Sequence, residues 1–422
     1  MISLRLFLLL LVTLGCRAWG DDQPPVLLGA AIAAALGVPL GFGLLFKASA
    51  IGLLASLDGS GHKVCWQRLH KIRHRVEVGW VMTLPAALLA TGWGAWLNAF
   101  ELAGVPQSLT LLGWFLPSLL FIVLVEWTAA QFDALGNVSG GETLSWGERW
   151  LARLRLGELA SMLTCLAPIL LIALLTDLAE LCLGERLTSV QIACATLASL
   201  TIVLLFFPLW LGNWMGVRRL PAGPLRERIE HLQQVVGIHG LEPMLLPSRG
   251  CWAGAAIVGW FPRFRKLWLG DALIERLSER QLDMVILHEL AHVSRRHFYW
   301  RASPILWALA AVGLCCAIWP EGEPWEAGRN MTASLLAGLI LLLGLGSMAR
   351  ACELDADRTA CLLAERVSPW ASGNRPLAAM ELGGALSALL QDAPAGAGRS
   401  WLHPSLARRL AELHPRRIRC NC

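Results

Sequence analysis

Long apolar stretches are the feature that most constrains what this chain can fold into. A helix that crosses a bilayer needs about 20 consecutive, predominantly apolar residues. We predict seven such spans: Val26–Phe46, Trp80–Phe100, Leu109–Val125, Leu159–Leu181, Leu187–Trp210, Pro304–Trp319 and Met331–Met348. The composition agrees, because 55% of the residues are hydrophobic and only 16% are charged, against about 25% charged in soluble domains. The expected fold class is a mainly α, polytopic membrane protein.

The first 20 residues have the pattern of a signal peptide. Arg5 precedes an apolar run, and Ala18 and Gly20 stand just before two aspartates, the order that such leaders show. We expect cleavage after Gly20, with an uncleaved anchor as the alternative. The net charge of +5 is spread along the chain without a nucleic-acid motif, so no nucleic-acid partner is expected.

Lysine and arginine concentrate in alternate loops. Segment 47–79 carries six of them and segment 127–157 carries three, whereas loop 101–108 carries none and loop 182–186 carries one. Basic loops tend to stay in the cytoplasm, so we expect a multi-pass protein of the cell membrane. The predicted parts are a signal peptide (1–20), a transmembrane region of five spans (21–210), a cytoplasmic segment (211–303), a transmembrane hairpin (304–348) and a second cytoplasmic segment (349–422).

The first cytoplasmic segment contains a predicted ribbon and a long helix. Residues 251–269 read as two strands that turn near Pro262. Ser278 and Gln281 then form a capping box, and the apolar residues that follow recur at helical spacing. We expect a helix over 279–298, and with it a cytoplasmic α+β domain with a small β-ribbon.

A metal-binding pattern lies on that helix, where His288 and His292 flank Glu289 as H-E-x-x-H. Residues four apart share a helical face, so both imidazoles can face one metal ion. A catalytic zinc has three protein ligands and one open position. Glu289 then suits the general base that activates a water molecule at the open position.

A third ligand is predicted beyond the last span. Glu353 and Asp357 are also four apart, and no proline interrupts residues 331–366, so one helix can run out of the bilayer. Glu353 would emerge about 7 Å beyond Met348, and the H-E-x-x-H helix leads into the other span of the same hairpin. We predict Glu353 as the third ligand of one Zn²⁺ per chain and Asp357 as the carboxylate that orients a ligating histidine.

These motifs resemble a known family, the membrane-embedded zinc metalloproteases that include the CAAX prenyl protease and the HtpX heat-shock protease. The resemblance consists of His288-Glu289-x-x-His292, then Glu353-x-x-x-Asp357-x-x-Ala360, then His403-Pro404-Ser405-Leu406-x-x-Arg409-Leu410. It implies a zincin-like domain in which His288, His292 and Glu353 bind zinc and Glu289 is the base. It further implies that His403 faces the scissile carbonyl and that Arg409 ties its segment to the site.

The resemblance is weaker at the strand that aligns the substrate. That strand usually begins Asn-Ala in the family, and here Trp252, Ala253 and Gly254 stand in its place. They are expected to bind the peptide backbone, without a side-chain preference that can be carried over. His297 matches a recurring family histidine after the zinc helix, but it lies five residues past His292 and off the ligand face. We do not count it as a ligand.

Together the motifs predict a membrane-integral zinc metalloendopeptidase, a hydrolase. We expect it to cleave peptide or membrane-protein substrates at the cytoplasmic membrane face, in membrane-protein quality control or processing. One alternative is a signal-transducing membrane metalloprotease of the antibiotic-sensor type, which the short outer loops disfavour. Another is a non-catalytic scaffold with a structural zinc, which would have no need of Glu289.

Overall fold

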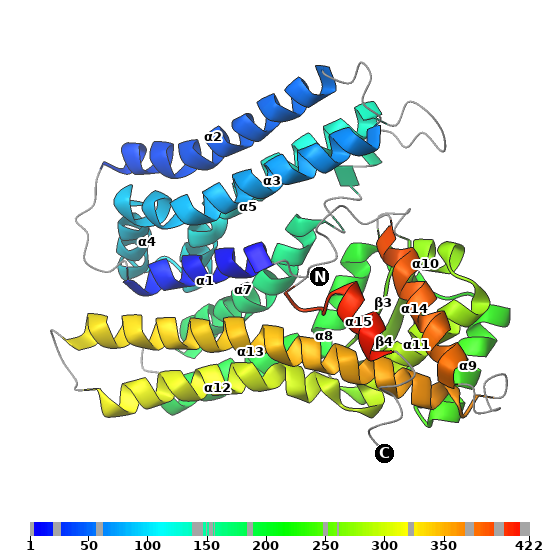
Figure 1. The fold of residues 1–422 in the computed structure, drawn as a ribbon. Coiled ribbons are helices and arrows are strands. Elements are labelled where there is room, and N and C mark those ends of the chain that lie inside the picture. Colours follow the sequence, from blue (N-terminus) through cyan, green and yellow to red (C-terminus); the bar gives the residue numbers. More distant parts are fainter. Residues whose placement is uncertain are drawn as a thin grey trace. The chain divides into compact units, whose positions relative to one another are not determined.

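The structure is a computed structural model, mostly helical and with one small sheet (Figure 1). It describes residues 4–19, 27–55, 62–136, 157–183, 189–247, 252–259, 261–319, 325–367, 375–391 and 401–413, with single positions between 147 and 155. The chain forms two compact units: Met1–Val203 with Leu314–Leu335 (unit 1), and Leu204–Gly313 with Leu336–Cys422 (unit 2). The expected mainly α class with a small β-structure is confirmed.

Several helices are long and apolar enough to cross a membrane. Among the described residues there are five, and a bent pair makes a sixth: Leu28–Ala55, Gln107–Phe132, Leu159–Cys182, His297–Ile318, Gly328–Ala364, and Gln67–Ala90 with Trp93–Leu102. The predicted span Leu187–Trp210 falls on α8 (Ser189–Met215), whose side chains are described only in part. The count of seven spans, the domain boundaries and the sidedness therefore stay predictions.

The predicted span Trp80–Phe100 is not one straight helix. Helix α3 (His62–Pro85) passes into a π-helical turn, η2 (Ala86–Ala90), and α4 (Trp93–Leu102) follows, with a bend of 52° at the break. Pro85 has no backbone N–H to continue the helix. Gly92 has φ 74°, a left-handed conformation that glycine adopts without a steric penalty. These two residues explain why the apolar run breaks in the middle.

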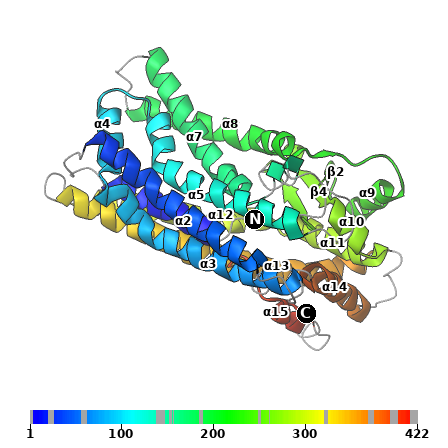
Figure 2. The ribbon, with the colours of Figure 1, turned by 90° about the horizontal axis from the view of Figure 1, so that it is seen from above.

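Unit 1 is a bundle of apolar helices. It includes α1 (Leu4–Trp19), α2 (Leu28–Ala55), α3, α4, α5 (Gln107–Gly136) and α7 (Glu158–Leu183). Helix α2 packs against α3 and α5 (Figure 2), and α1 packs against α3. Leu6 and Leu9 of α1 are buried, and Arg5 forms an ion pair with Glu77 of α3. Cleavage after Gly20 stays a prediction, and Gly20 lies outside the described residues.

Unit 2 contains a four-stranded mixed sheet in the order β1-β2-β4-β3. The strands are β1 (Arg218–Arg219), β2 (Glu242–Leu246), β3 (Ala255–Val258) and β4 (Lys266–Gly270). Strands β3 and β4 are antiparallel and joined through a 3₁₀ turn at Pro262–Phe264, as the predicted ribbon requires. Strand β2 pairs in parallel with β4 and was not predicted. In the described part of the chain, β3 is an edge strand.

Helix α11 (Glu279–Ser294) is central to unit 2. It packs against α9 (Pro224–Val236), α14 (Arg375–Gln391) and β3, near α10 (Asp271–Arg276) in Figure 2. The predicted capping box is formed, since the Gln281 N–H donates to Ser278 Oγ and the Ser278 N–H donates to Gln281 Oε1. Ile286 and Leu290 are fully buried in the core. The helix that carries H-E-x-x-H is therefore fixed at its start and along its buried face.

The predicted helix over 279–298 is wrong at its end. Helix α11 ends at Ser294, and α12 (His297–Ile318) begins after a two-residue turn. In that turn Arg296 has φ 55°, the one positive φ among the described non-glycine residues. A left-handed residue cannot continue a right-handed helix, so the chain changes direction between His292 and His297.

Helix α13 (Trp325–Ala364) continues unbroken past Met348, as predicted. Within unit 2 it lies beside α12 (Figure 1), and a Cβ atom built on Gly344 would lie 2.8 Å from Cβ of Pro304. This close approach of the two helices brings the start of α12 opposite Glu353 and Asp355 on α13.

We predict that Arg296→Gly is tolerated and that Arg296→Val is not. The left-handed conformation costs an L-residue about 1–2 kcal/mol, a cost that glycine avoids at the expense of about 0.5–1 kcal/mol in unfolded-chain entropy. Arg296→Gly should therefore leave the free energy of unfolding within about 1 kcal/mol of wild type, and Arg296→Val should lower it by roughly 1–3 kcal/mol. Thermal unfolding of the detergent-solubilised protein measures both. Equal effects of the two substitutions would contradict the assigned backbone conformation.

Candidate metal centre

Three side chains with metal-ligand atoms meet in unit 2. His288 and His292 of α11 and Glu353 of α13 each offer one such atom, and these atoms lie within 4.8 Å of one another. The two Nε2 atoms are 3.3 Å apart, and carboxylate oxygens of Glu353 lie 3.7 Å and 3.5 Å from them. Ligands about 2.0–2.2 Å from a zinc ion lie roughly 3.3–3.6 Å from one another in a tetrahedron. The donor set therefore fits a divalent cation.

Both helices present their ligand groups by helical spacing. His288 and His292 stand one turn apart on α11, and Glu353 and Asp357 stand one turn apart on α13. Ala356 is fully buried in the hydrophobic core to which α11 also contributes. That core holds α11 and α13 so that His288 and His292 of one helix meet Glu353 of the other.

The Glu353 carboxylate is the electrostatic centre of the site. It is only 3% exposed, and a buried carboxylate must be paired to be tolerated. Arg301 of α12 donates a hydrogen bond of 2.6 Å to Glu353 Oε1. Nδ1 of His403 and Nη1 of Arg409 lie 3.0 Å and 3.5 Å from Oε2. Donors from two separate segments, α12 and residues 401–413, therefore converge on this one side chain.

Asp357 supports His288 from behind. It is fully buried, and its carboxylate lies 2.9 Å from His288 Nδ1. Arg409 of α15 (Leu406–Glu412) donates two hydrogen bonds to it, of 2.7 Å and 2.5 Å. The residues predicted to brace the site, Asp357 and Arg409, thus lie together next to a predicted ligand.

The surroundings change the proton affinities of the α11 residues. Burial opposes a charge on His288, but the nearby Asp357 and Glu353 carboxylates outweigh it and raise its pKa to about 9. Those carboxylates favour a divalent cation for the same reason. Burial lowers the pKa of His292 to about 4, which leaves a neutral ring that can ligate. Burial raises the pKa of Glu289 to about 7, against the effect of His288, so this carboxyl can take up and release a proton near neutrality.

The remaining predicted residues lie on two segments of unit 2. His403 precedes α15, which Ser405 caps by accepting from the Arg408 N–H. Trp401 in the same segment accepts a hydrogen bond of 2.6 Å from Arg350 of α13, so the segment is tied to that helix.

The predicted substrate residues Trp252, Ala253 and Gly254 lead into β3. The Gly254 carbonyl accepts a hydrogen bond of 3.0 Å from the Gly270 N–H, so antiparallel pairing with β4 begins there. Strand β3 packs against α11, the helix that carries His288 and His292. Contact of Trp252, Ala253 and Gly254 with a substrate stays a prediction.

Arg301 and Asp355 are polar residues of the site that the sequence analysis missed. Arg301 lies inside a helix apolar enough to span a membrane, and an ionisable residue there is a functional candidate by default. That signal could have identified it. Asp355 lies between Glu353 and Asp357 on a different face of α13, and no local pattern distinguishes it from a solvated residue.

Membrane-length apolar helices, together with a His-His-Glu cluster whose two histidines lie on an H-E-x-x-H helix, are typical of one class of protein, the integral membrane metalloproteases. The crystal structure of S. mikatae Ste24p is similar in fold, with a TM-score of 0.51 at 14% sequence identity over 93% of this chain and 100% of that chain. No curated protein sequence matches the chain.

The family follows from the C-terminal half of the chain. Residues 221–417 match the model of peptidase family M48, and they include all ligand-type residues of the cluster. Residues 221–417 belong to this family, and their match together with the Ste24p-like fold supports a membrane metalloprotease.

We predict that Arg409→Ala strongly destabilises unit 2. Arg409 is 8% exposed and Asp357 fully buried, so the substitution leaves a buried carboxylate without its main partner. Breaking such a pair costs about 3–5 kcal/mol. The neighbouring Arg408 is exposed, and Arg408→Ala is the matched control. Chemical denaturation should show a large loss for the first variant and almost none for the second, and similar losses would refute the ion pair.

Proposed function

We propose that the protein is a zinc-dependent endopeptidase, with one Zn²⁺ held by His288, His292 and Glu353. The observation that supports this most directly is the convergence of their ligand atoms within 4.8 Å, next to Glu289 on the helix that carries the two histidines. A purely structural site has no need of a carboxyl group between the two histidines.

Four polar residues around the proposed ligands have a role in this proposal. A bound zinc ion supplies a Lewis acid for the scissile carbonyl and makes water a better nucleophile at neutral pH. Glu289 takes a proton from the attacking water and returns it to the leaving amine. His403, whose side chain is 29% exposed, donates a hydrogen bond to the developing oxyanion. Asp357, held by Arg409, keeps His288 in the orientation that ligation requires.

The substrate backbone is proposed to pair with the edge of β3 that has no partner strand among the described residues. The Gly254 carbonyl faces β4, and in an antiparallel ladder neighbouring residues face alternate sides. Ala256 therefore also faces β4, whereas Ala255 and Ile257 turn their N–H and C=O groups to the open edge. An extended peptide can add there as a further strand, with Trp252, Ala253 and Gly254 at its end.

We further propose that substrates come from membrane proteins and are cleaved at the cytoplasmic membrane face, in quality control or processing. Glu353 and Arg301 lie on helices with the length and hydropathy of membrane spans. Basic loops on the predicted cytoplasmic side favour that orientation. In this proposal, a site built on such helices lies close to segments that leave the bilayer.

We predict that Glu289→Gln abolishes proteolysis while zinc stays bound. Losing a general base costs about 10²–10⁴-fold in rate, whereas the three proposed ligands are unchanged. Cleavage of an unfolded membrane protein, together with metal analysis of the same preparation, tests this. Glu275→Gln, at an exposed position of α10, is the matched control.

Removal of zinc by a chelator should abolish the same activity, and added zinc should restore it. An active Glu289→Gln enzyme would refute the proposal. Unfolding of unit 2 on chelation, with no cleavage by the wild type, would favour a structural zinc instead.

We predict that Ala255→Pro raises KM with little effect on folding. Proline removes a backbone donor that faces the open edge, a position where an edge strand tolerates it. Ala256→Pro removes a donor that faces β4 and should instead lower stability. Peptidase kinetics and thermal unfolding of both variants separate the two effects, and an unchanged KM for Ala255→Pro would argue against strand addition at this edge.

A further inference from the structure

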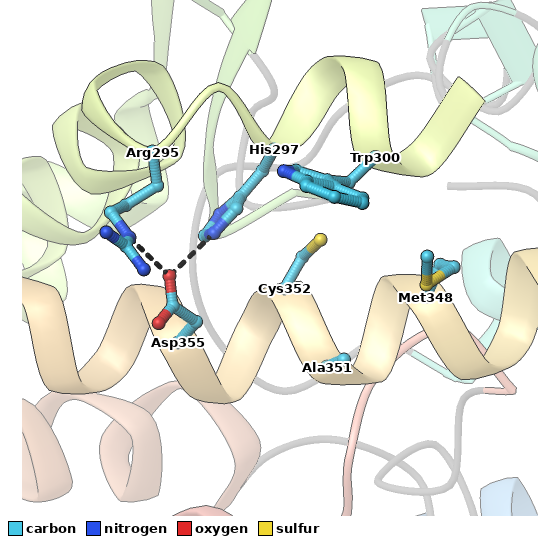
Figure 3. A pocket seen from close by; sticks show the side chains of 7 residues that line it. All are labelled: Arg295, His297, Trp300, Met348, Ala351, Cys352 and Asp355. Carbon is cyan, nitrogen blue, oxygen red and sulfur yellow. Dashed lines mark hydrogen bonds and ion pairs between the residues drawn. The ribbon is translucent and has the colours of Figure 1, made fainter. Parts of the chain in front are cut away.

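A polar chain lies behind His292, on the side away from the other ligand atoms. His292 Nδ1 is 2.8 Å from Nδ1 of His297, and Nε2 of His297 is 2.9 Å from Oδ2 of Asp355. His297 is only 4% exposed. Figure 3 shows His297 reaching from α12 across to Asp355 on α13. His292 is thus connected through a second imidazole to a carboxylate.

The proton positions along this chain follow from the proposed metal site. A ligating His292 needs a lone pair on Nε2, so the proton of its neutral ring is on Nδ1. The His292 Nδ1–H then donates a hydrogen bond to Nδ1 of His297. The proton of the neutral His297 ring is therefore on Nε2. There it faces an Asp355 oxygen, which can only accept. The reverse arrangement would block the ligating atom and set a lone pair against a carboxylate.

We propose that His297 and Asp355 are positioning residues that fix the tautomer and ring orientation of His292 for metal binding. This inference rests on the proposed zinc site. The two histidine ligands are then held differently, since Asp357 contacts His288 directly and Asp355 acts on His292 through His297. Neither His297 nor Asp355 touches the substrate or the metal ion in this role.

The backbone between α11 and α12 is built for this contact. Because Arg296 is left-handed, a new helix starts at His297, and the His297 side chain turns back to His292. Uncommon conformations of this kind in non-glycine residues concentrate at functional sites. Arg295, on the other side of the turn, donates a hydrogen bond of 2.9 Å to the same Asp355 oxygen, which holds the carboxylate in position (Figure 3).

A cavity beside His297 makes the proposal testable by chemical rescue. It has a volume of about 230 Å³ and is lined by Arg295, His297, Trp300, Met348, Ala351, Cys352 and Asp355. An apolar cavity of about 150 Å³ is enough to hold benzene, a ring larger than imidazole. In His297→Ala, free imidazole can therefore enter the vacated position and bridge His292 to Asp355 again.

The experiment measures zinc affinity of the detergent-solubilised full chain by competition with a chromophoric chelator. Loss of a partner behind a ligand typically lowers metal affinity about 10–100-fold, and we expect this for His297→Ala and His297→Phe, with a smaller loss for Asp355→Ala. Imidazole should restore the zinc affinity of His297→Ala, compared with that of the wild type at the same imidazole concentration. It should not restore His297→Phe, whose ring fills the space. The exposed His239 provides the matched control His239→Ala, with wild-type affinity expected.

Cobalt substitution adds a spectroscopic readout. The visible spectrum of the Co²⁺ protein should change in His297→Ala and return with imidazole, which a loss of packing alone would not produce. Unchanged zinc affinity in His297→Ala, or a loss that imidazole leaves as it was, would overturn the role of His297. A wild-type chain that binds no zinc would overturn the proposed function and this inference together.

Discussion

The buried carboxylate of Glu353 is the constraint on which the organisation of unit 2 depends. An unpaired charge at 3% exposure would cost several kcal/mol, so positively polarised groups must be brought to it. Helix α11 contributes His288 and His292, α12 contributes Arg301, and the segment before α15 contributes His403. A divalent cation satisfies the same carboxylate, so the fold and the metal ion favour one arrangement.

Rigidity and openness are divided between different elements around this carboxylate. Helix α11 is capped at its start and buried along one side, which holds ligands to the narrow tolerance that a metal centre needs. Strand β3 lies next to it at the edge of the described sheet. A fixed centre beside an unpaired strand edge is suited to holding an extended chain still while one bond is attacked.

The parts of this architecture that depend on local sequence were predictable. Ser278 and Gln281 marked the start of the zinc-type helix, the absence of proline after Met331 indicated one continuous helix, and the ribbon turned where Pro262 stands. Each of these features is decided by residues within a turn or two of one another.

The missed features depend on tertiary contacts. Strand β2 becomes a strand through parallel pairing with β4, for example between Glu242 and Lys266, and its own residues carry no alternating pattern. Arginine is a good helix former, so nothing in the sequence marks Arg295 and Arg296 as the turn that follows α11. Asp355 gains its contact with His297 only because α12 and α13 lie side by side. Such features are set by distant partners, which a single sequence does not reveal.

The central claim is that two imidazoles and one carboxylate surround a single zinc ion, and X-ray absorption at the zinc edge tests it most directly. Purified wild-type protein should contain one zinc per chain with two histidine nitrogens at about 2.0–2.1 Å and further oxygen ligands at about 2.0–2.2 Å. Glu353→Gln should bind less zinc per chain, and the zinc that remains should still show the two imidazole ligands. Absence of zinc, a sulfur-dominated shell, or a signal without two imidazoles would contradict the account.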